Sequence, residues 1–186
     1  MKTLILNGSP KPNGDTSALL NALTADLRGE VRALSCFSGI AACNDCRFCW
    51  TKPGCAIQDG MQEIYPYLAQ CDNIVLASPI WFSSLSGPLL NLASRMQTLY
   101  CATAFRGEPP AERSKNGVIL LCGAEPHTAE RPKATALTIM KFMGVNRDAV
   151  TYIASLDTNN TPAARDAEAL RQCREAAALL NARAGL

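Results

Sequence analysis

The chain has 186 residues, of which 48% are hydrophobic and 18% charged, and its formal net charge at pH 7 is +2. This length suits one domain with a substantial core, and the composition excludes an intrinsically disordered chain. The small net charge argues against a nucleic-acid-binding protein. The longest apolar stretches are about ten residues, too short to span a bilayer, and a strand pattern begins without a signal-peptide pattern before it. We therefore expect a single domain over residues 1–186 in the cytoplasm, with neither a nucleic-acid nor a membrane partner.

The N-terminal segment predicts a strand, a loop and a helix. An apolar run at residues 4–6 is followed by a loop rich in glycine, proline and small polar residues, and an amphipathic segment opens at Asp15. A helix N-terminus exposes unpaired N–H groups and the positive end of its dipole, so such a loop can bind a phosphate. The candidate phosphate contacts are Ser9, Lys11, Gly14, Thr16 and Ser17.

An ordinary strand-to-helix turn capped by Asp15 explains the same residues and stays open at this point. The loop matches neither GxGxxG nor GxxxxGK[ST], so neither a Rossmann dinucleotide site nor a P-loop is indicated.

The rest of the chain continues as alternating strands and helices. Strands are expected at residues 30–37, 73–80, 118–122 and 150–156. Helices are expected from Asp15 to Gly29, over 59–70 with a kink or an early end at Pro66, from about 86 through Leu99, over 129–143, and from Thr161 onward, with a loop over 102–116. Five strands alternating with five helices indicate a parallel sheet with helices on both faces.

Nine cysteines are present, and their odd number argues against a disulfide framework. Four of them form a C-x2-C-x2-C-x5-C motif within residues 43–55, and the other five lie in apolar patterns, where we expect them to pack as small hydrophobic side chains. Four thiolates in one short loop can bind a [4Fe–4S] cluster or a structural zinc ion, and the spacing favours the cluster. The candidate metal ligands are Cys43, Cys46, Cys49 and Cys55.

Three segments resemble one known family. GSPKPNGDT at residues 8–16 resembles the GSPR-x-x-GNT loop of the flavodoxin-like NADPH-dependent FMN reductases and iron–sulfur flavoproteins, which holds the FMN phosphate. SPIWFSSLSGPLLNLASR at residues 78–95 is similar to the family pattern SP-I-Y-x-x-S-x-S-x-x-L-K-x-F-I-D-R. The cysteine motif resembles that of the iron–sulfur flavoproteins, which precedes a helix that commonly begins DDM; here the letters are Asp59, Gly60 and Met61.

Four of the positions at which this chain departs from the family pattern bear on the predicted site. Asp15 replaces the usual Asn, and since a carboxylate would repel phosphate, we expect Asp15 to cap the helix and face away. Trp81 replaces Tyr, while Leu90 and Ser94 replace Lys and Asp. We expect the last two changes to affect surface or interface charge more than contact with a flavin ring.

The resemblance implies a flavodoxin-like three-layer sandwich with five parallel strands in the order 2-1-3-4-5 and FMN beyond their carboxyl ends. Apolar side chains and backbone N–H groups after the third strand would contact the flavin ring, although an isolated Trp-Phe pair is more often core. The candidate ring contacts are Pro79, Ile80, Trp81, Phe82, Ser83 and Gly123. The only histidine, His127, is expected to be a surface residue, and no catalytic side chain is assigned because the chemistry belongs to the flavin.

The implied function is an FMN-dependent oxidoreductase. Electrons would pass from NAD(P)H or a ferredoxin to a quinone, a flavin or an oxygen species, with a [4Fe–4S] cluster as a second redox centre, in a homodimer or homotetramer. Two alternatives stay open: a flavodoxin-type carrier without small-molecule turnover, and a zinc or thiol sensor module. Flavodoxin-type carriers are typically strongly acidic, which the net charge of +2 does not match.

Overall fold

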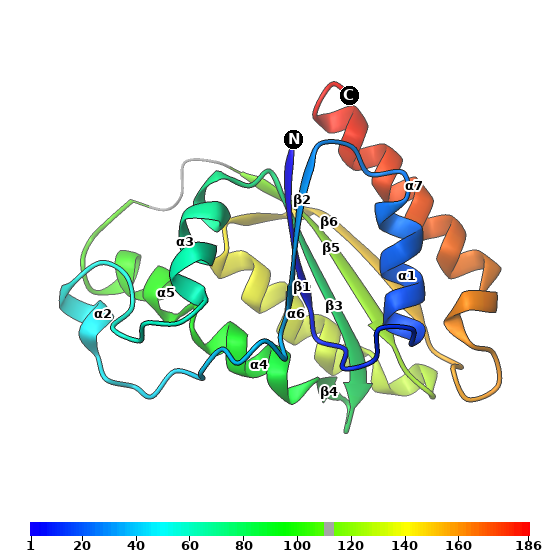
Figure 1. The fold of residues 1–186 in the computed structure, drawn as a ribbon, viewed down its shortest axis with the longest axis horizontal. Coiled ribbons are helices and arrows are strands. Elements are labelled where there is room, and N and C mark those ends of the chain that lie inside the picture. The colour runs from blue at the N-terminus through cyan, green and yellow to red at the C-terminus, as the bar shows by residue number, and fades with distance from the viewer. Residues whose placement is uncertain (110–113) are drawn as a thin grey trace.

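Five parallel strands form the central layer of the computed structural model, which describes residues 1–109 and 114–186. They are β1 (Lys2–Asn7), β2 (Glu30–Ser35), β3 (Asn73–Trp81), β5 (Lys115–Cys122) and β6 (Val145–Ser155). Their order across the sheet is β2-β1-β3-β5-β6 (Figure 1), and the two-residue strand β4 (Ser84–Leu85) pairs antiparallel with the end of β3. Numbered among the parallel strands alone, this is the order 2-1-3-4-5, so the predicted fold is confirmed.

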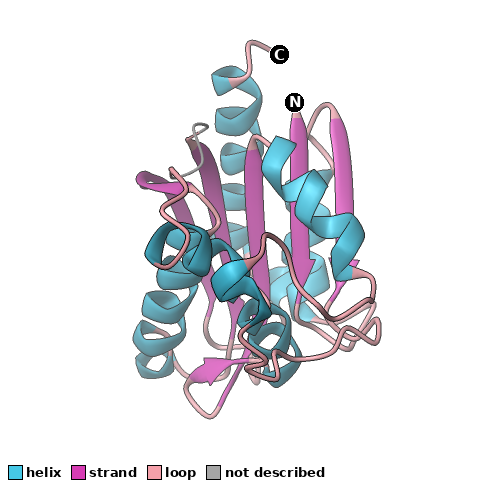
Figure 2. Ribbon diagram, turned by 90° about the vertical axis from the view of Figure 1, so that its left-hand side faces the viewer, coloured by secondary structure: helices cyan, strands magenta, loops and turns pink. Residues whose placement is uncertain are grey.

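Helices cover both faces of the sheet, and Figure 2 shows them in front of and behind the strands. One face carries α1 (Asp15–Thr24) and α7 (Ala167–Arg183), and the other carries α3 (Met61–Gln70), α4 (Gly87–Ser94), α5 (Gln97–Ala104) and α6 (Glu130–Phe142). The short segments are α2 (Phe48–Thr51) in the cysteine loop and the 3-10 turns η1 (Pro126–Thr128) and η2 (Ala163–Arg165). None of the described helices is both long and apolar enough to cross a lipid bilayer.

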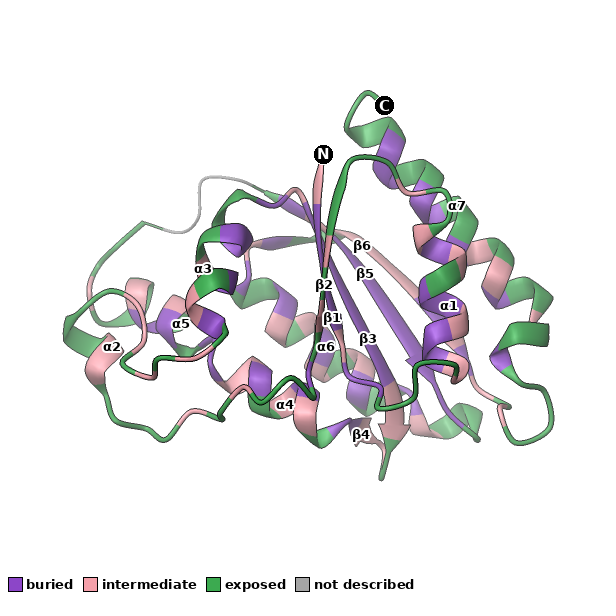
Figure 3. Ribbon diagram, viewed as in Figure 1, coloured by how far each residue is buried: buried purple, intermediate pink, exposed green. Residues whose placement is uncertain are grey.

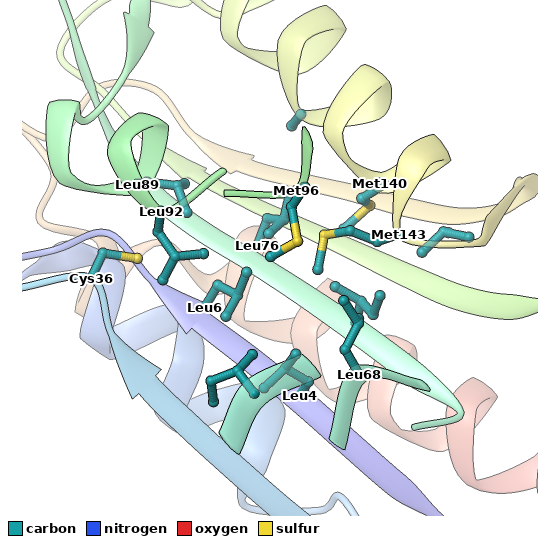
Figure 4. Close-up of a cluster of buried hydrophobic side chains, with 14 of the residues drawn as sticks. Leu4, Leu6, Cys36, Leu68, Leu76, Leu89, Leu92, Met96, Met140 and Met143 are labelled. Atoms are coloured by element: carbon teal, nitrogen blue, oxygen red, sulfur yellow. The ribbon is translucent and has the colours of Figure 1, made fainter. Parts of the chain in front are cut away.

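The core has two halves, one on each face of the sheet. Along β1, Leu4 and Leu6 point into the half shared with α3, α4 and α6, while Ile5 points into the half shared with α1 and α7. This alternation follows from the two-residue period of a strand. Figure 3 shows the central strands buried along most of their length, and Figure 4 shows side chains of the first half, among them Leu76, Met96 and Met140.

Several predicted boundaries were wrong. The first helix ends at Thr24 rather than at Gly29, because Asn181 of α7 accepts a hydrogen bond from the Arg28 amide and donates one to the Asp26 carbonyl, which holds this segment outside the helix. The helix expected from residue 86 is two helices, and the second runs to Ala104, inside the predicted loop.

Two further differences concern β6 and Pro66. β6 begins at Val145, five residues earlier than predicted, where it pairs with the start of β5 across a bulge. Pro66 lies inside α3, which continues to Gln70, so the proline does not end the helix. Residues 110–113 of the predicted loop 102–116 lie outside the described residues.

Candidate functional site

The predicted phosphate loop joins β1 to α1 and is tied to the neighbouring strand. The Gly8 amide donates to the Ala77 carbonyl at 2.8 Å, and the Ser9 amide donates to the Asn7 side chain at 2.9 Å. Gly8 passes so close to the start of α4 that a Cβ atom there would lie 2.6 Å from the Ser86 hydroxyl and 2.9 Å from the Leu89 Cβ. Only glycine fits where the chain passes this close to α4. This close approach fixes the position at which the loop begins.

The candidate phosphate contacts divide into those that shape the loop and those that face outward. The Lys11 carbonyl accepts hydrogen bonds from the Ser17 hydroxyl at 2.8 Å and from the Gly14 amide at 3.3 Å, so Ser17 and Gly14 close the loop. Ser9 and Thr16 are buried, whereas the Lys11 side chain is exposed. The N-terminus of α1 has no side-chain cap among the described residues. Its first amides are therefore available to an anion.

Asp15 does not cap α1, contrary to the prediction. Its carboxylate accepts a hydrogen bond from the Ala163 amide of η2 at 2.8 Å. The negative charge is therefore held by a segment that comes nearly 150 residues later in the chain, which is why sequence pattern alone did not reveal its partner.

The candidate ring contacts lie on a hairpin at the end of β3. Ile80 pairs with Leu85 and Trp81 with Ser84, which leaves Phe82 and Ser83 as a two-residue turn, with φ of 52° and 54°. Two consecutive residues with positive φ are the signature of a type I′ turn, and without glycine they are strained. The turn presents Phe82 fully exposed and Trp81 41% exposed, so neither is a core aromatic.

The carboxyl ends of β1, β3 and β5 meet at one edge of the sheet. Asn7 is in register with Ala77, and Pro79 with Cys122. Gly123, after β5, is buried against Ile80, so that a Cβ atom there would lie 3.0 Å from the Ile80 Cδ1. The structure therefore places the candidate ring contacts of both loops together, beside the phosphate loop. His127 lies exposed on η1, 3.1 Å from Glu125.

The cysteine loop is held by a buried ion pair between Arg95 and Asp59. The Arg95 side chain is fully buried and bonds both carboxylate oxygens of Asp59, at 2.6 and 3.2 Å. It also donates to the Ala41 carbonyl before the motif and to the Ile57 carbonyl after it, at 3.0 and 3.2 Å. One guanidinium thus joins the two ends of the loop.

Further contacts fix the loop between these ends. The Cys43 amide donates to the Ser94 hydroxyl at 2.9 Å, and the Thr98 hydroxyl donates to the Gly54 carbonyl at 2.8 Å. Ser94 therefore anchors the cysteine loop, a role that the sequence did not indicate. Asp45 and Arg47 have positive φ, so the chain curls between the cysteines.

All four motif cysteines line one small cavity of about 40 Å³, together with Arg95 and a fifth cysteine, Cys101 of α5. The Sγ atoms of Cys49 and Cys101 are 3.6 Å apart. Burial, and after it the Cys101 thiol, raise the pKa of Cys49 to about 11. Sequence reasoning assigned Cys101 to packing and missed its place beside the motif.

The residue types at this cavity suit an iron–sulfur cluster, while their present geometry does not form a metal site. Four cysteines are the usual ligands of a [4Fe–4S] cluster, and the Nε–H of Arg95 is buried without a hydrogen-bond partner among the described residues, available to an anionic, sulfur-rich group. In the arrangement described here, no three His, Cys, Asp or Glu side chains of residues 1–109 and 114–186 are close enough to hold one metal ion. The cysteines would have to draw together to bind one.

The Asp59–Arg95 pair predicts how acid affects the fold. Burial alone would raise the pKa of Asp59, but hydrogen bonds from Arg95 and from the Met61 and Ala41 amides outweigh it and lower that pKa. A carboxyl whose pKa is lower in the folded state contributes stability above its unfolded pKa of about 3.9, and this is lost as the pH falls through the folded pKa. We expect Asp59→Asn to cost about 3 kcal/mol at pH 7 and to flatten the loss of stability below about pH 4.

Urea unfolding of both proteins between pH 7 and pH 3 measures this difference. An equal loss of stability on acidification in the two proteins would show that Asp59 is not the carboxyl responsible.

The fold and these loops define a class of protein: a flavodoxin-like parallel sheet with a glycine-bearing loop and two apolar loops at the carboxyl edge, where this class binds FMN. The family model for NADPH-dependent FMN reductase matches residues 1–149. The chain belongs to this family of oxidoreductases, and the predicted resemblance is confirmed.

Curated relatives carry the name iron–sulfur flavoprotein. One from Methanocaldococcus jannaschii, MJ1083, is 30% identical over 126 residues, which are 63% of this chain and 65% of the relative. One from Archaeoglobus fulgidus is 26% identical over 149 residues, 78% of this chain and 64% of the relative. The chain thus matches slightly less than two thirds of the length of either.

Solved structures support the fold. An NAD(P)H:quinone oxidoreductase from Methanothermobacter marburgensis superposes with a TM-score of 0.71 at 16% identity, covering 98% of this chain and 96% of that one. The azoreductase AzrA superposes with a TM-score of 0.64 at 13% identity, covering 98% and 100%. At these identities the likeness concerns the fold alone.

Proposed function

We propose that this chain binds FMN at the carboxyl edge of the sheet and passes electrons from NAD(P)H or a ferredoxin to a small acceptor, a quinone, a flavin or an oxygen species. The observation that carries the proposal is the contact between the β1 and β3 loops through Gly8, which sets an uncapped helix N-terminus beside an exposed aromatic hairpin. A phosphate and a flat apolar ring need these two environments side by side.

Within this proposal the chain's residues bind and orient the flavin. The first amides of α1 and the Ser9 hydroxyl would hold the phosphate, with the Lys11 charge nearby. The hairpin would cover the ring with Trp81 and Phe82, and the amides of Phe82 and Ser83, outside the β3–β4 ladder, are free to meet ring oxygens and nitrogens. FMN when bound exchanges a hydride or single electrons.

We further propose that Cys43, Cys46, Cys49 and Cys55 hold a [4Fe–4S] cluster, a one-electron centre. The names of the curated relatives and the cavity shared by the four thiols support this. The buried Arg95 would offset the cluster's negative charge. A ferredoxin is then a fitting one-electron donor.

The distance between the two candidate centres supports a homo-oligomer. Figure 1 shows α2 and the cysteine loop at the left of the molecule and the phosphate loop below α1 at the right. Within one chain the cluster and the flavin would lie on different sides of the fold. In a homodimer or homotetramer, the cluster of one protomer can face the flavin of another.

The nine free cysteines favour the cytoplasm, where thiols stay reduced. Steady-state oxidation of NADH and NADPH under nitrogen, with a quinone or ferricyanide as acceptor, tests the activity. Turnover with either nucleotide supports a reductase. If neither nucleotide nor a reduced ferredoxin drives acceptor reduction, a flavodoxin-type carrier is the better assignment.

Phe82→Ala is expected to weaken FMN binding about two- to tenfold, since an aromatic stack contributes about 0.5–1.5 kcal/mol. The side chain is fully exposed, so its loss should not destabilise the fold. Quenching of FMN fluorescence on titration measures the affinity. Leu179→Ala removes an exposed apolar side chain from α7 and serves as the matched control. Equal affinity in the two variants would exclude Phe82 from the flavin site.

A further inference from the structure

Cys101 stands outside the cysteine motif, and its thiol is nevertheless in contact with the motif. Its Sγ lies 3.6 Å from the Sγ of Cys49. A disulfide bond is about 2.05 Å long, so the two sulfur atoms need to approach by roughly 1.5 Å to form one. Rotation of the two cysteine side chains would have to supply this movement.

The two helices that carry these thiols are fastened to each other on both sides of the pair. Trp50, next to Cys49, stacks on Phe105 with ring centroids 4.3 Å apart and an interplanar angle of 8°. The Arg106 guanidinium donates to the Cys49 carbonyl and is itself held by Glu108 at 2.6 Å. These contacts keep α2 on α5 and hold the thiols side by side before any oxidation, which raises their effective concentration.

The two thiols also differ in access. Cys49 is partly exposed at the rim of the cavity, whereas Cys101 is 1% exposed. Of these two thiols, Cys49 is therefore the one that a small oxidant in the cavity reaches, and the Cys101 sulfur is 3.6 Å from it. The order of access is that of an attacking and a resolving cysteine, and the raised pKa of Cys49 makes its attack slow at neutral pH.

We propose that Cys49 and Cys101 form a reversible disulfide when a peroxide reaches the cysteine loop. The Cys49 sulfur attacks one peroxide oxygen and becomes a sulfenic acid, with release of one water or alcohol. The Cys101 sulfur then displaces the hydroxyl group, which leaves as water, and the S–S bond forms. Two thiols are oxidised and one peroxide is reduced, and a dithiol reductant reverses the step by exchange.

The disulfide would remove Cys49 from the set of metal ligands. An oxidised loop could not bind the cluster until the disulfide is reduced. The Cys49–Cys101 pair would therefore couple cluster assembly to the presence of peroxide. Only this consequence rests on the proposed cluster. The pairing itself rests on the contact between the two thiols and on the fastened helices.

The test uses the full chain, purified anaerobically, freed of iron with a chelator and exposed to hydrogen peroxide. Remaining thiols are blocked under denaturing conditions, and disulfide-linked peptides are mapped by mass spectrometry with and without dithiothreitol. We expect Cys49–Cys101 to be the main disulfide in the unchanged protein. The control variant Cys173→Ser, which removes a buried thiol in α7, should form the same disulfide. In Cys101→Ser we expect Cys49 to be trapped as a sulfenic acid that reacts with dimedone. Recovery of Cys101 as a free thiol, or of Cys49 joined to another motif cysteine, overturns the proposal.

Iron and sulfide reconstitution separates this inference from the proposed function. We expect the reduced chain to take up iron and the peroxide-treated chain to take up none until dithiothreitol is added. Equal iron uptake by both forms would show that the disulfide does not prevent cluster binding, and it overturns that consequence. If the disulfide forms and neither form takes up iron, the thiol pair stands and the cluster proposal fails.

Discussion

Cys46→Ser is expected to lower the iron content of anaerobically purified protein from about four atoms per chain to near zero, with the FMN content unchanged. Cys46 is exposed at the cavity and its side chain is not needed for core packing, so the fold should survive the change. Serine is a poor ligand for iron in such a cluster, which is held by thiolates. The flavin is expected to stay because its loops lie on another side of the molecule.

Cys173→Ser is the matched control, since it removes a buried thiol from the opposite face of the sheet. Iron, sulfide and flavin are quantified in both variants and in the unchanged chain. Retention of iron by Cys46→Ser, or loss of iron from both variants alike, would contradict the assignment of the motif as the cluster site.

Gly8→Ala is expected to destabilise the fold by about 1–3 kcal/mol, as overpacking of a close-packed contact does, and to weaken FMN binding about tenfold or more. The added methyl group would lie 2.6 Å from the Ser86 hydroxyl and 2.9 Å from the Leu89 Cβ. To relieve the clash, the loop must move away from α4. That movement would strain the hydrogen bond from Gly8 to Ala77 and displace Ser9.

Gly87→Ala provides the comparison, because a Cβ atom at residue 87 meets nothing within 4 Å. Urea unfolding gives the stability of each variant, and FMN fluorescence quenching gives the affinity. If Gly8→Ala binds FMN as tightly as Gly87→Ala does, the close crossing of the two loops is not what shapes the phosphate site.

Hydrophobic periodicity was enough to predict the alternation of strands and helices. The strand order came from the family resemblance, because spacing alone does not say which strands are neighbours. The boundaries that failed depend on tertiary contacts. The first helix ends early because the Asn181 side chain, from the last helix, hydrogen-bonds to the backbone of Asp26 and Arg28. The start of β6 depends on its pairing with β5.

In the candidate site, too, residues set by local spacing could be predicted and residues set by tertiary contacts could not. Glycine and serine positions in the phosphate loop and the cysteine motif can be read from local sequence, since local spacing determines them. Arg95 matches the arginine that ends the family pattern over residues 78–95. Only the fold shows that its guanidinium joins both ends of the cysteine loop. Cys101 gave no sequence signal at all, because its contact with Cys49 spans 52 positions of the chain.

The most direct test of this account is the composition of the protein purified without oxygen. Iron, acid-labile sulfide, zinc and flavin are counted per chain, alongside a visible spectrum. We expect one FMN and about four irons with matching sulfide, giving flavin bands over a broad cluster absorbance. Zinc without flavin would contradict it and favour the thiol sensor module.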